Sequence, residues 1–306
     1  MLNNTYLKQA GLVLRVLPYI AREEVFALKG GTAINFFWRD YPRLSVDIDL
    51  TYLKIQERAL SMHDISDHLA SIEMKIGRIF PGIKVTQQLN KEDSTVNGLI
   101  IKDEDATVKV EVNPVIRGVV FPFVNKKLCA KAEATFELTL SVNTLSFEDL
   151  YGGKICAALD RQHPRDLFDI KLLFANEGLT EGIRKAFLVY LISHDRPMVE
   201  VLNPSLLDIR QIFDNEFAGM TAKEIELKEL IDIRNKLIKL IKVSLTEKEV
   251  EFLLSFKNKT PHWDLLGLRG IEKFPAPQWK LINLTKMNPE KHKLAFQKLE
   301  KYLLSN

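Results

Sequence analysis

Two short segments carry residues whose types and spacing suit chemistry at a phosphate group. Leu28-Lys29-Gly30-Gly31-Thr32 is followed, after fourteen residues, by Asp47-Ile48-Asp49. Gly30 and Gly31 lack side chains where a backbone must come close to a ligand, and the N–H groups of a helix that begins there can hold a phosphate. Asp47 and Asp49, at i and i+2 of a strand, share one face about 7 Å apart. Such a pair predicts a site for one or two divalent cations that act on phosphates.

A third acid is expected to belong to the same site. Lys109-Val110-Glu111-Val112-Asn113 reads as a strand in which Glu111 lies between two valines that face a core. In a twisted sheet the face that carries Glu111 can join the face that carries Asp47 and Asp49. The sequence therefore predicts that Glu111 can join Asp47 and Asp49 at one metal site.

The elements that must position these residues can be predicted from the hydrophobic pattern. Glu24–Lys29 is a short apolar run that ends at the two glycines, which indicates a strand and a turn. Thr32 is expected to cap a helix over Ala33–Trp38. Val46, Ile48 and Leu50 alternate with polar residues, which predicts a strand whose carboxylates lie on one face.

The rest of the chain divides into a mixed front and a helical back. Helical spacing predicts helices over Tyr6–Ile20 and Gln56–Ile79, and a hairpin turn is expected at residues 103–105. From Ser146 onward the pattern is almost wholly helical. We therefore predict an α/β (α+β) protein of two lobes. Residues 1–145 should form an α/β lobe around a small mixed sheet, and residues 146–306 a helical lobe. Further strands are expected over Ile83–Gln88, Leu99–Lys102, Thr107–Asn113 and Thr135–Val142.

Composition excludes several classes of protein. The chain has 306 residues, of which 46% are hydrophobic and 27% charged, so it can bury a sizeable core. It contains no apolar run long enough to span a membrane and no signal-peptide pattern. Cys129 and Cys156 cannot form a disulfide framework, and neither has metal-ligand spacing. We therefore expect a cytoplasmic protein.

The charges are distributed unevenly. Residues 223–306 contain 17 Lys and Arg against 11 Asp and Glu, whereas the preceding residues carry a net charge of −3. An acidic front with a basic back suits an enzyme whose metal-binding carboxylates act on a polyanion, but lysine-rich helices with solvated outer faces give the same balance.

The order Gly-Gly-Thr, Asp-x-Asp and a later lone acid resembles that of the nucleotidyltransferase superfamily that includes polymerase beta. A closer resemblance is to the AbiEii-type nucleotidyltransferase toxins of type IV toxin–antitoxin systems. It extends over about residues 25–175, and FPAPQWKLINL near the C-terminus also looks similar. It depends on the segments KGGTAINFF, RLSVDIDL, VKVEVN and EDLYGGKICAALDRQHPRDLFDI.

The resemblance implies a polymerase-beta-like lobe and assigns roles to individual residues. The residues implied in nucleotide binding are Lys29, Gly30, Gly31 and Thr32, together with Lys154 as a positive charge near the triphosphate. Asp47, Asp49 and Glu111 are implied as metal ligands and, with Lys154, Asp166 and Asp169, as catalytic residues. Of Asp166 and Asp169, one is expected to be functional and the other to form an ion pair or cap a helix.

The resemblance also implies an activity. Such toxins use Mg²⁺ or Mn²⁺ and transfer a nucleotide from a nucleoside triphosphate (NTP) to the 3′ end of tRNA, which blocks translation. The implied partners are the NTP, tRNA and a cognate AbiEi-type DNA-binding antitoxin, with no membrane. Two alternatives stay open: transfer to a protein hydroxyl of the toxin itself, the antitoxin or another target, and a non-catalytic module that binds RNA or a partner.

Alternatives also stay open for single residues near the motifs. Asp166 can cap the helix that follows Pro164. Arg43 can contact a phosphate or be an ordinary surface arginine. Arg161, His163 and Arg165 can guide RNA or pair with nearby acids.

Overall fold

The computed structural model describes residues 2–90 and 95–305 and divides the chain into two compact units. Unit 1 comprises Met1–Leu150 and Asn215–Ile225, and unit 2 comprises Tyr151–Asp214 and Glu226–Asn306. The first boundary thus falls at residue 150 rather than 145, and the short segment 215–225 belongs to unit 1. No helix in the described part of the chain is long and apolar enough to cross a membrane.

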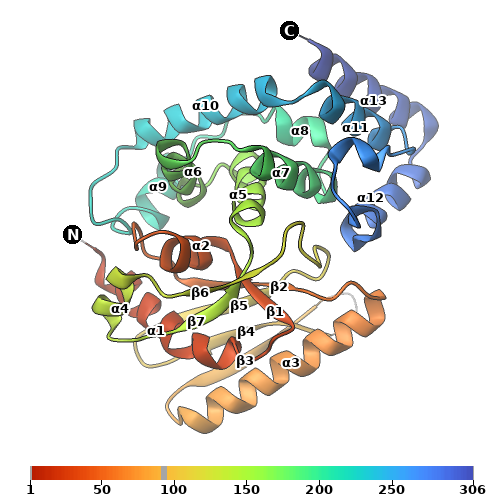
Figure 1. Cartoon of the computed structure of the whole chain (residues 1–306). Coiled ribbons are helices and arrows are strands. Elements are labelled where there is room, and N and C mark those ends of the chain that lie inside the picture. Colours follow the sequence, from red (N-terminus) through yellow and green to blue (C-terminus); the bar gives the residue numbers. More distant parts are fainter. Residues whose placement is uncertain (1, 91–94, 306) are drawn as a thin grey trace. The chain divides into compact units, whose positions relative to one another are not determined.

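Unit 1 is built on a mixed sheet of seven described strands in the order β3-β4-β5-β2-β1-β7-β6 (Figure 1). β2 pairs in parallel with β5, and β1 with β7, while the other neighbours are antiparallel. The strands are β1 (Phe26–Lys29), β2 (Asp47–Tyr52), β3 (Lys84–Leu89), β4 (Val96–Lys102), β5 (Thr107–Val112), β6 (Val124–Lys127) and β7 (Ser141–Thr144). A mixed sheet with helices confirms the predicted fold class of this lobe, although the sheet is larger than expected.

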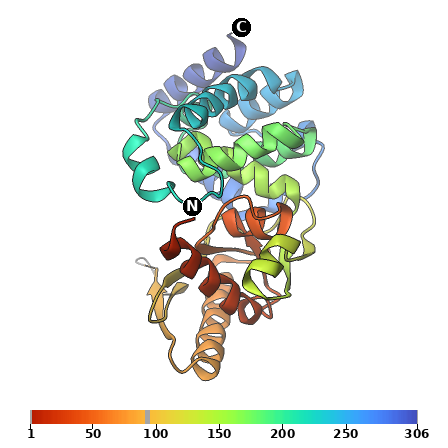
Figure 2. The ribbon, with the colours of Figure 1, turned by 90° about the vertical axis from the view of Figure 1, so that its left-hand side faces the viewer.

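Two helices cover one face of this sheet. α1 (Asn4–Ile20) contacts β2 and β5, and α3 (Arg58–Ile79) contacts β3 and β4, as Figure 2 shows with α1 in red and α3 in orange. The side chains of Val108, Val110 and Val112 on β5 point to this face and are buried, whereas those of Lys109 and Glu111 between them are exposed. Glu111, the one acid of β5, therefore lies on the face opposite to α1 and α3.

The sequence pattern predicted most of these elements but missed β6 and was wrong at two further places. The predicted strand over Thr135–Val142 is wrong, because α4 (Ala130–Phe136) occupies its start and β7 its end. The run Ala130-Lys131-Ala132-Glu133-Ala134 consists of strong helix formers, and Glu137, the C-cap of the helix, has a left-handed backbone conformation. The second error concerns the helix that follows β1: it begins at Gly30, with Lys29 as N-cap, and not after Thr32.

Unit 2 is helical, as predicted. α6 packs against α10, α7 against α12, and α11 against α13. The helices that lie wholly or partly in this unit are α5 (Phe147–Arg161, which begins in unit 1), α6 (Pro164–Asn176), α7 (Glu181–Ser193), α8 (Met198–Leu202), α9 (Arg210–Glu216, which ends in unit 1), α10 (Leu227–Ser244), α11 (Glu247–Lys257), α12 (Pro275–Lys286) and α13 (Pro289–Leu304), with the 3₁₀ turns η2 (Trp263–Leu266) and η3 (Ile271–Lys273).

Candidate active site

The turn between β1 and the short helix α2 (Gly30–Ala33) is shaped by a carboxylate. Gly30 has φ +70°, and a Cβ atom at this position would lie 2.2 Å from Oδ2 of Asp49. Both the backbone conformation and the approach of Asp49 therefore require glycine here. The group that comes close to the Gly30 backbone is thus the carboxylate of Asp49, and the approach of a ligand to this turn stays a prediction.

The next two residues of the motif are packed against β2 and the residues before it. A Cβ atom at Gly31 would lie 2.7 Å from Nη2 of Arg43 and 2.9 Å from Oγ of Ser45. The Thr32 hydroxyl is fully buried and donates to the carbonyl oxygen of Asp47 at 2.5 Å. Its side chain thus fixes the turn to β2. The backbone N–H groups of Gly30, Gly31 and Thr32 are still predicted to bind phosphate.

Arg43 is buried rather than an ordinary surface arginine. Its guanidinium donates to the carbonyl oxygen of Leu44 at 2.9 Å, and it occupies the space that Gly31 leaves free. The π-helical turn η1 (Ile34–Trp38) continues α2 and is followed by the loop that contains Arg43. Arg43 is therefore part of the packing behind the Gly-Gly turn.

The acids of β2 and β5 lie in register. Asp49 is opposite Glu111 in the parallel pair β2–β5 and opposite Lys29 in the antiparallel pair β1–β2. Residues at the same register position of neighbouring strands point to the same face, about 4.8 Å apart. Asp47 lies two residues before Asp49 on that face and is opposite Lys109. The sheet therefore gathers Lys29, Asp47, Asp49 and Glu111 on the face opposite to α1 and α3, and the spacing predicted this shared face for the three acids.

A cavity of about 400 Å³ opens at this row of residues, and its lining comes from unit 1 alone. Its volume lies in the range of small-molecule sites. Within the described residues, neither Asp49 nor Glu111 forms an ion pair, so both carboxylates can accept a cation. The cavity is lined by Lys29, Asp49, Gln88, Leu89, Asn97, Glu111, Val112 and Asn113.

The donor set of this row fits a hard divalent cation. No three His, Cys, Asp or Glu side chains among residues 2–90 and 95–305 come together as a complete metal site. Mg²⁺, however, is commonly held by one or two carboxylates, with substrate phosphates and water as its remaining ligands. Asp49 with Asp47 or Glu111 can supply that share of the ligands. Metal binding by these three acids stays a prediction.

Unit 2 brings the other motif residues into one buried cluster. The Nζ atom of Lys154 on α5 lies 2.8 Å from Oδ1 of Asp166 and 3.1 Å from Oδ2 of Asp169, both on α6. The exposed fractions of the three side chains are 7%, 1% and 0%. Arg161 donates from Nε to Oδ2 of Asp166 at 2.7 Å. Two cations and two carboxylates thus neutralise one another.

The contacts of this cluster bear on the alternative roles considered for Arg161 and Asp166. Arg161 pairs with an acid, and the N-cap of α6 is His163, whose side chain accepts from the N–H of Arg165. Asp166 therefore does not cap the helix. Burial by itself raises the pKa of Asp166, but the charges of Lys154 and Arg161 and their hydrogen bonds hold that pKa well below its usual range.

The similar-looking C-terminal segment FPAPQWK has a structural role in unit 2. Lys280, on α12, donates from Nζ to the carbonyl oxygens of His194, Asp195 and Arg196 at 2.5, 2.8 and 2.9 Å. These carbonyls follow the last turn of α7, where a cation is favourable. Burial lowers the pKa of Lys280 to about 8. The motif thus holds the end of α7 against α12.

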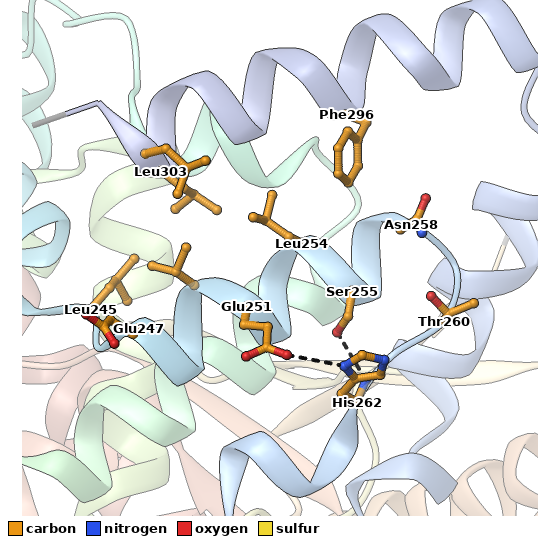
Figure 3. Close-up of a pocket in the computed structure, with 12 residues that line it drawn as sticks. Leu245, Glu247, Glu251, Leu254, Ser255, Asn258, Thr260, His262, Phe296 and Leu303 are labelled. Carbon is orange, nitrogen blue, oxygen red and sulfur yellow. Dashed lines mark hydrogen bonds and ion pairs between the residues drawn. The ribbon is translucent and has the colours of Figure 1, made fainter.

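A larger cavity of unit 2, of about 590 Å³, has a different character (Figure 3). Leu254 of α11 and Phe296 and Leu303 of α13 form its apolar wall, and His262 turns toward Glu251, with 3.6 Å between Nδ1 and Oε1. It contains none of the predicted catalytic residues. Its lining offers an apolar surface rather than a site for phosphates.

Comparison with solved structures agrees with this fold. MenT4, a nucleotidyltransferase toxin from Mycobacterium tuberculosis H37Rv, superposes with a TM-score of 0.60 at 14% sequence identity, over 99% of this chain and 96% of that one. At this identity the likeness concerns the fold. No curated protein matches the sequence.

The mixed sheet, the Gly-Gly turn and the acids in register are the framework of a nucleotidyltransferase. Residues 12–275 match the family described as "Nucleotidyl transferase AbiEii toxin, Type IV TA system", and the chain belongs to this family. The expected family resemblance is thereby confirmed, and so is the enzyme class. Membership also implies an NTP substrate and an antitoxin partner. It removes the non-catalytic module as an alternative function.

Gln88, Asn97 and Asn113 line the site but were not found from the sequence. Gln88 and Asn97 lie on the β3–β4 hairpin, whose register with β5 only the structure gives. Asn113 is the last residue of the strand predicted around Glu111, and this proximity to Glu111 was the one signal that pointed to it.

Proposed function

We propose that this toxin transfers a nucleotide from an NTP to the 3′ hydroxyl of tRNA with the help of a divalent cation, Mg²⁺ or Mn²⁺. The observation that carries the proposal is the row of Lys29, Asp49 and Glu111 in register across β1, β2 and β5, at the cavity of unit 1. This row combines the ammonium group of Lys29 with the carboxylates of Asp49 and Glu111, neither of which forms an ion pair within the described residues.

In the proposed reaction, an oxygen of the acceptor hydroxyl attacks the α-phosphorus of the NTP. The bond between that phosphorus and the bridging oxygen breaks, and pyrophosphate leaves. Glu111, exposed on β5, accepts the proton of the hydroxyl or completes the metal site. A bound cation, held by Asp47 and Asp49, would neutralise charge on the phosphates. Lys29 adds a positive charge at the same row. Roles for Lys154, Asp166 and Asp169 in transfer stay predictions from the family motif.

The proposal of tRNA as acceptor has two supports. One is the resemblance to toxins that modify tRNA, and the other is the positive charge of residues 223–306, which favours a polyanion. A cytoplasmic location and a DNA-binding antitoxin belong to the same proposal. A protein hydroxyl is the competing acceptor.

The test uses the purified full chain, Mg²⁺, each α-labelled NTP in turn and total tRNA. We expect label in RNase-sensitive material of tRNA size, and Asp49→Asn should lower transfer at least 100-fold because a carboxylate ligand is lost. Asp67→Asn, on the exposed side of α3, is the matched control and should transfer normally. Protease-sensitive label would replace tRNA by a protein acceptor. Full activity of Asp49→Asn would contradict the proposed site.

A further inference from the structure

The row of the candidate active site continues across two more strands. Glu111 of β5 is opposite Gly98 of β4, and Gly98 is opposite Gln88 of β3. Glu111 and Gln88 are therefore two strand spacings apart, about 10 Å. This is comparable with the length of a nucleotide from its α-phosphate to the far edge of its base.

Gly98 allows the Gln88 carboxamide to lie in this row. A Cβ atom at Gly98 would lie 2.7 Å from the carbonyl oxygen of Val110 and 2.9 Å from Oε1 of Gln88. The backbone carbonyl cannot move away cheaply, so a side chain is excluded at this position. Without one, Gln88 extends across the strand toward Glu111 and lines the cavity.

Asn97 reaches the same cavity through an irregularity of the sheet. Gln88 pairs with Gly98, but the next residue of β3, Leu89, pairs with Val96, so Asn97 has no partner in the ladder. An extra residue of this kind is a β-bulge, which turns a side chain out of the regular alternation. The bulge places the second carboxamide in the lining.

Asn113 presents a donor of fixed orientation. Its Oδ1 accepts the N–H groups of Val115 at 2.9 Å and Ile116 at 2.8 Å. Because only an oxygen can accept from these two groups, the carboxamide cannot flip, and Nδ2 is left to donate. Asn113 lies directly after β5 and lines the cavity.

We propose that Gln88, Asn97 and Asn113 bind the base of the incoming NTP and thereby select it. This inference rests on the proposed function, since it takes the phosphates to lie at Lys29, Asp49 and Glu111. Carboxamides offer a donor and an acceptor side by side, which is the chemistry that recognises base edges, and they add no charge that would repel phosphates. The fixed Nδ2 of Asn113 requires an acceptor atom on the base, whereas Gln88 and Asn97 supply the remaining contacts.

The test measures equilibrium binding of the four NTPs to the full-length protein with Mg²⁺ and without any acceptor. The wild type should favour one base, and Asn113→Asp should reduce that preference at least tenfold. Asp keeps the acceptor for Val115 and Ile116 but replaces the donor. The added negative charge by itself weakens binding of all four NTPs alike, so a change in their ratio reports the loss of the donor. Asn215→Asp, exposed on α9, is the matched control and should keep the wild-type ratio.

Asn97→Ala and Gln88→Ala provide a second readout, because they remove carboxamides without adding charge. Each should lower the preference among bases, with an unchanged thermal midpoint showing that the sheet is intact. Equal binding of all four NTPs by the wild type overturns the proposal, as does an unchanged ratio in all three variants. A variant that changes only the preference for the acceptor's terminal base also overturns it. Failure of the proposed function shows separately, as absence of label in tRNA while NTP binding stays selective.

Discussion

The buried lysine of the second motif shows how single residues set both charge and stability. Lys154 is held between Asp166 and Asp169, and Arg161 completes the balance of charge. A cation in this position is tolerated because two carboxylates replace the water it has lost. Removal of one carboxylate leaves charge that the surrounding side chains cannot neutralise.

Asp166→Asn should lower the free energy of unfolding by about 3 kcal/mol at pH 7, because it breaks a buried ion pair. The folded-state pKa of Asp166 lies below its unfolded value of about 3.9, so its contribution is present above pH 4 and is lost as the pH falls further. Urea unfolding between pH 7 and 3 should therefore show a smaller loss on acidification for the variant than for the wild type.

Asp105→Asn is the control for this measurement. Asp105 pairs with Lys8 at 2.7 Å, but both side chains are largely exposed, so the expected cost is under about 1 kcal/mol. A cost for Asp166→Asn no larger than that of the control would contradict the account of the buried cluster.

At the scale of the elements, the site depends on sequence signals of unequal range. The alternation around Asp47 and Asp49 and the apolar neighbours of Glu111 are local, and they predicted the strands and the shared face correctly. The bulge at Asn97 and the row through Gly98 depend on which residue of one strand meets which residue of the next. That register is set by pairing over the whole hairpin, so it cannot be predicted from the local sequence near Asn97.

The paired glycines of α5 illustrate a second distinction that the sequence does not make. A Cβ atom at Gly152 would lie 2.7 Å from the backbone nitrogen of Phe187 on α7, whereas one at Gly153 would lie 3.4 Å from the ring of Tyr190. Gly152 is thus required for the close contact of α5 with α7. Gly153 is in ordinary van der Waals contact.

Gly152→Ala should destabilise unit 2 by about 1–3 kcal/mol, because α7 must shift to admit the methyl group. Gly153→Ala should be neutral or stabilising by up to about 1 kcal/mol, since alanine is the better helix former. Thermal unfolding of the two variants beside the wild type checks the difference. Equal effects of the two substitutions would refute the packing argument.

At the scale of the whole molecule, unit 1 is not one continuous stretch of chain. Segment 215–225 returns to it after most of α5 and all of α6–α8 have been built into unit 2. The segment contributes backbone hydrogen bonds from Leu44 N–H to the Met220 carbonyl oxygen at 2.8 Å and from Asn3 N–H to that of Gly219 at 2.9 Å. Its Thr221 also forms a bridge with Arg43. It therefore supports the arginine that packs behind Gly31.

Gly219→Ala should loosen this support. Gly219 has φ +81°, and a Cβ atom there would lie 3.0 Å from Cβ of Asn3, so both strain and contact oppose the substitution. Amide hydrogen exchange at Leu44 should become at least tenfold faster. Gly178→Ala has the same kind of backbone strain with no neighbour within 4 Å, and it should leave exchange at Leu44 unchanged.

The interrupted course of unit 1 has a consequence for the order in which the toxin is made. When residue 150 leaves the ribosome, all seven described strands and the row of acids have been translated, yet segment 215–225 has not. At roughly 5–20 residues per second, several more seconds of translation pass before it follows. A chain that terminates prematurely in this interval carries the residues of the transfer site without the segment that supports Arg43.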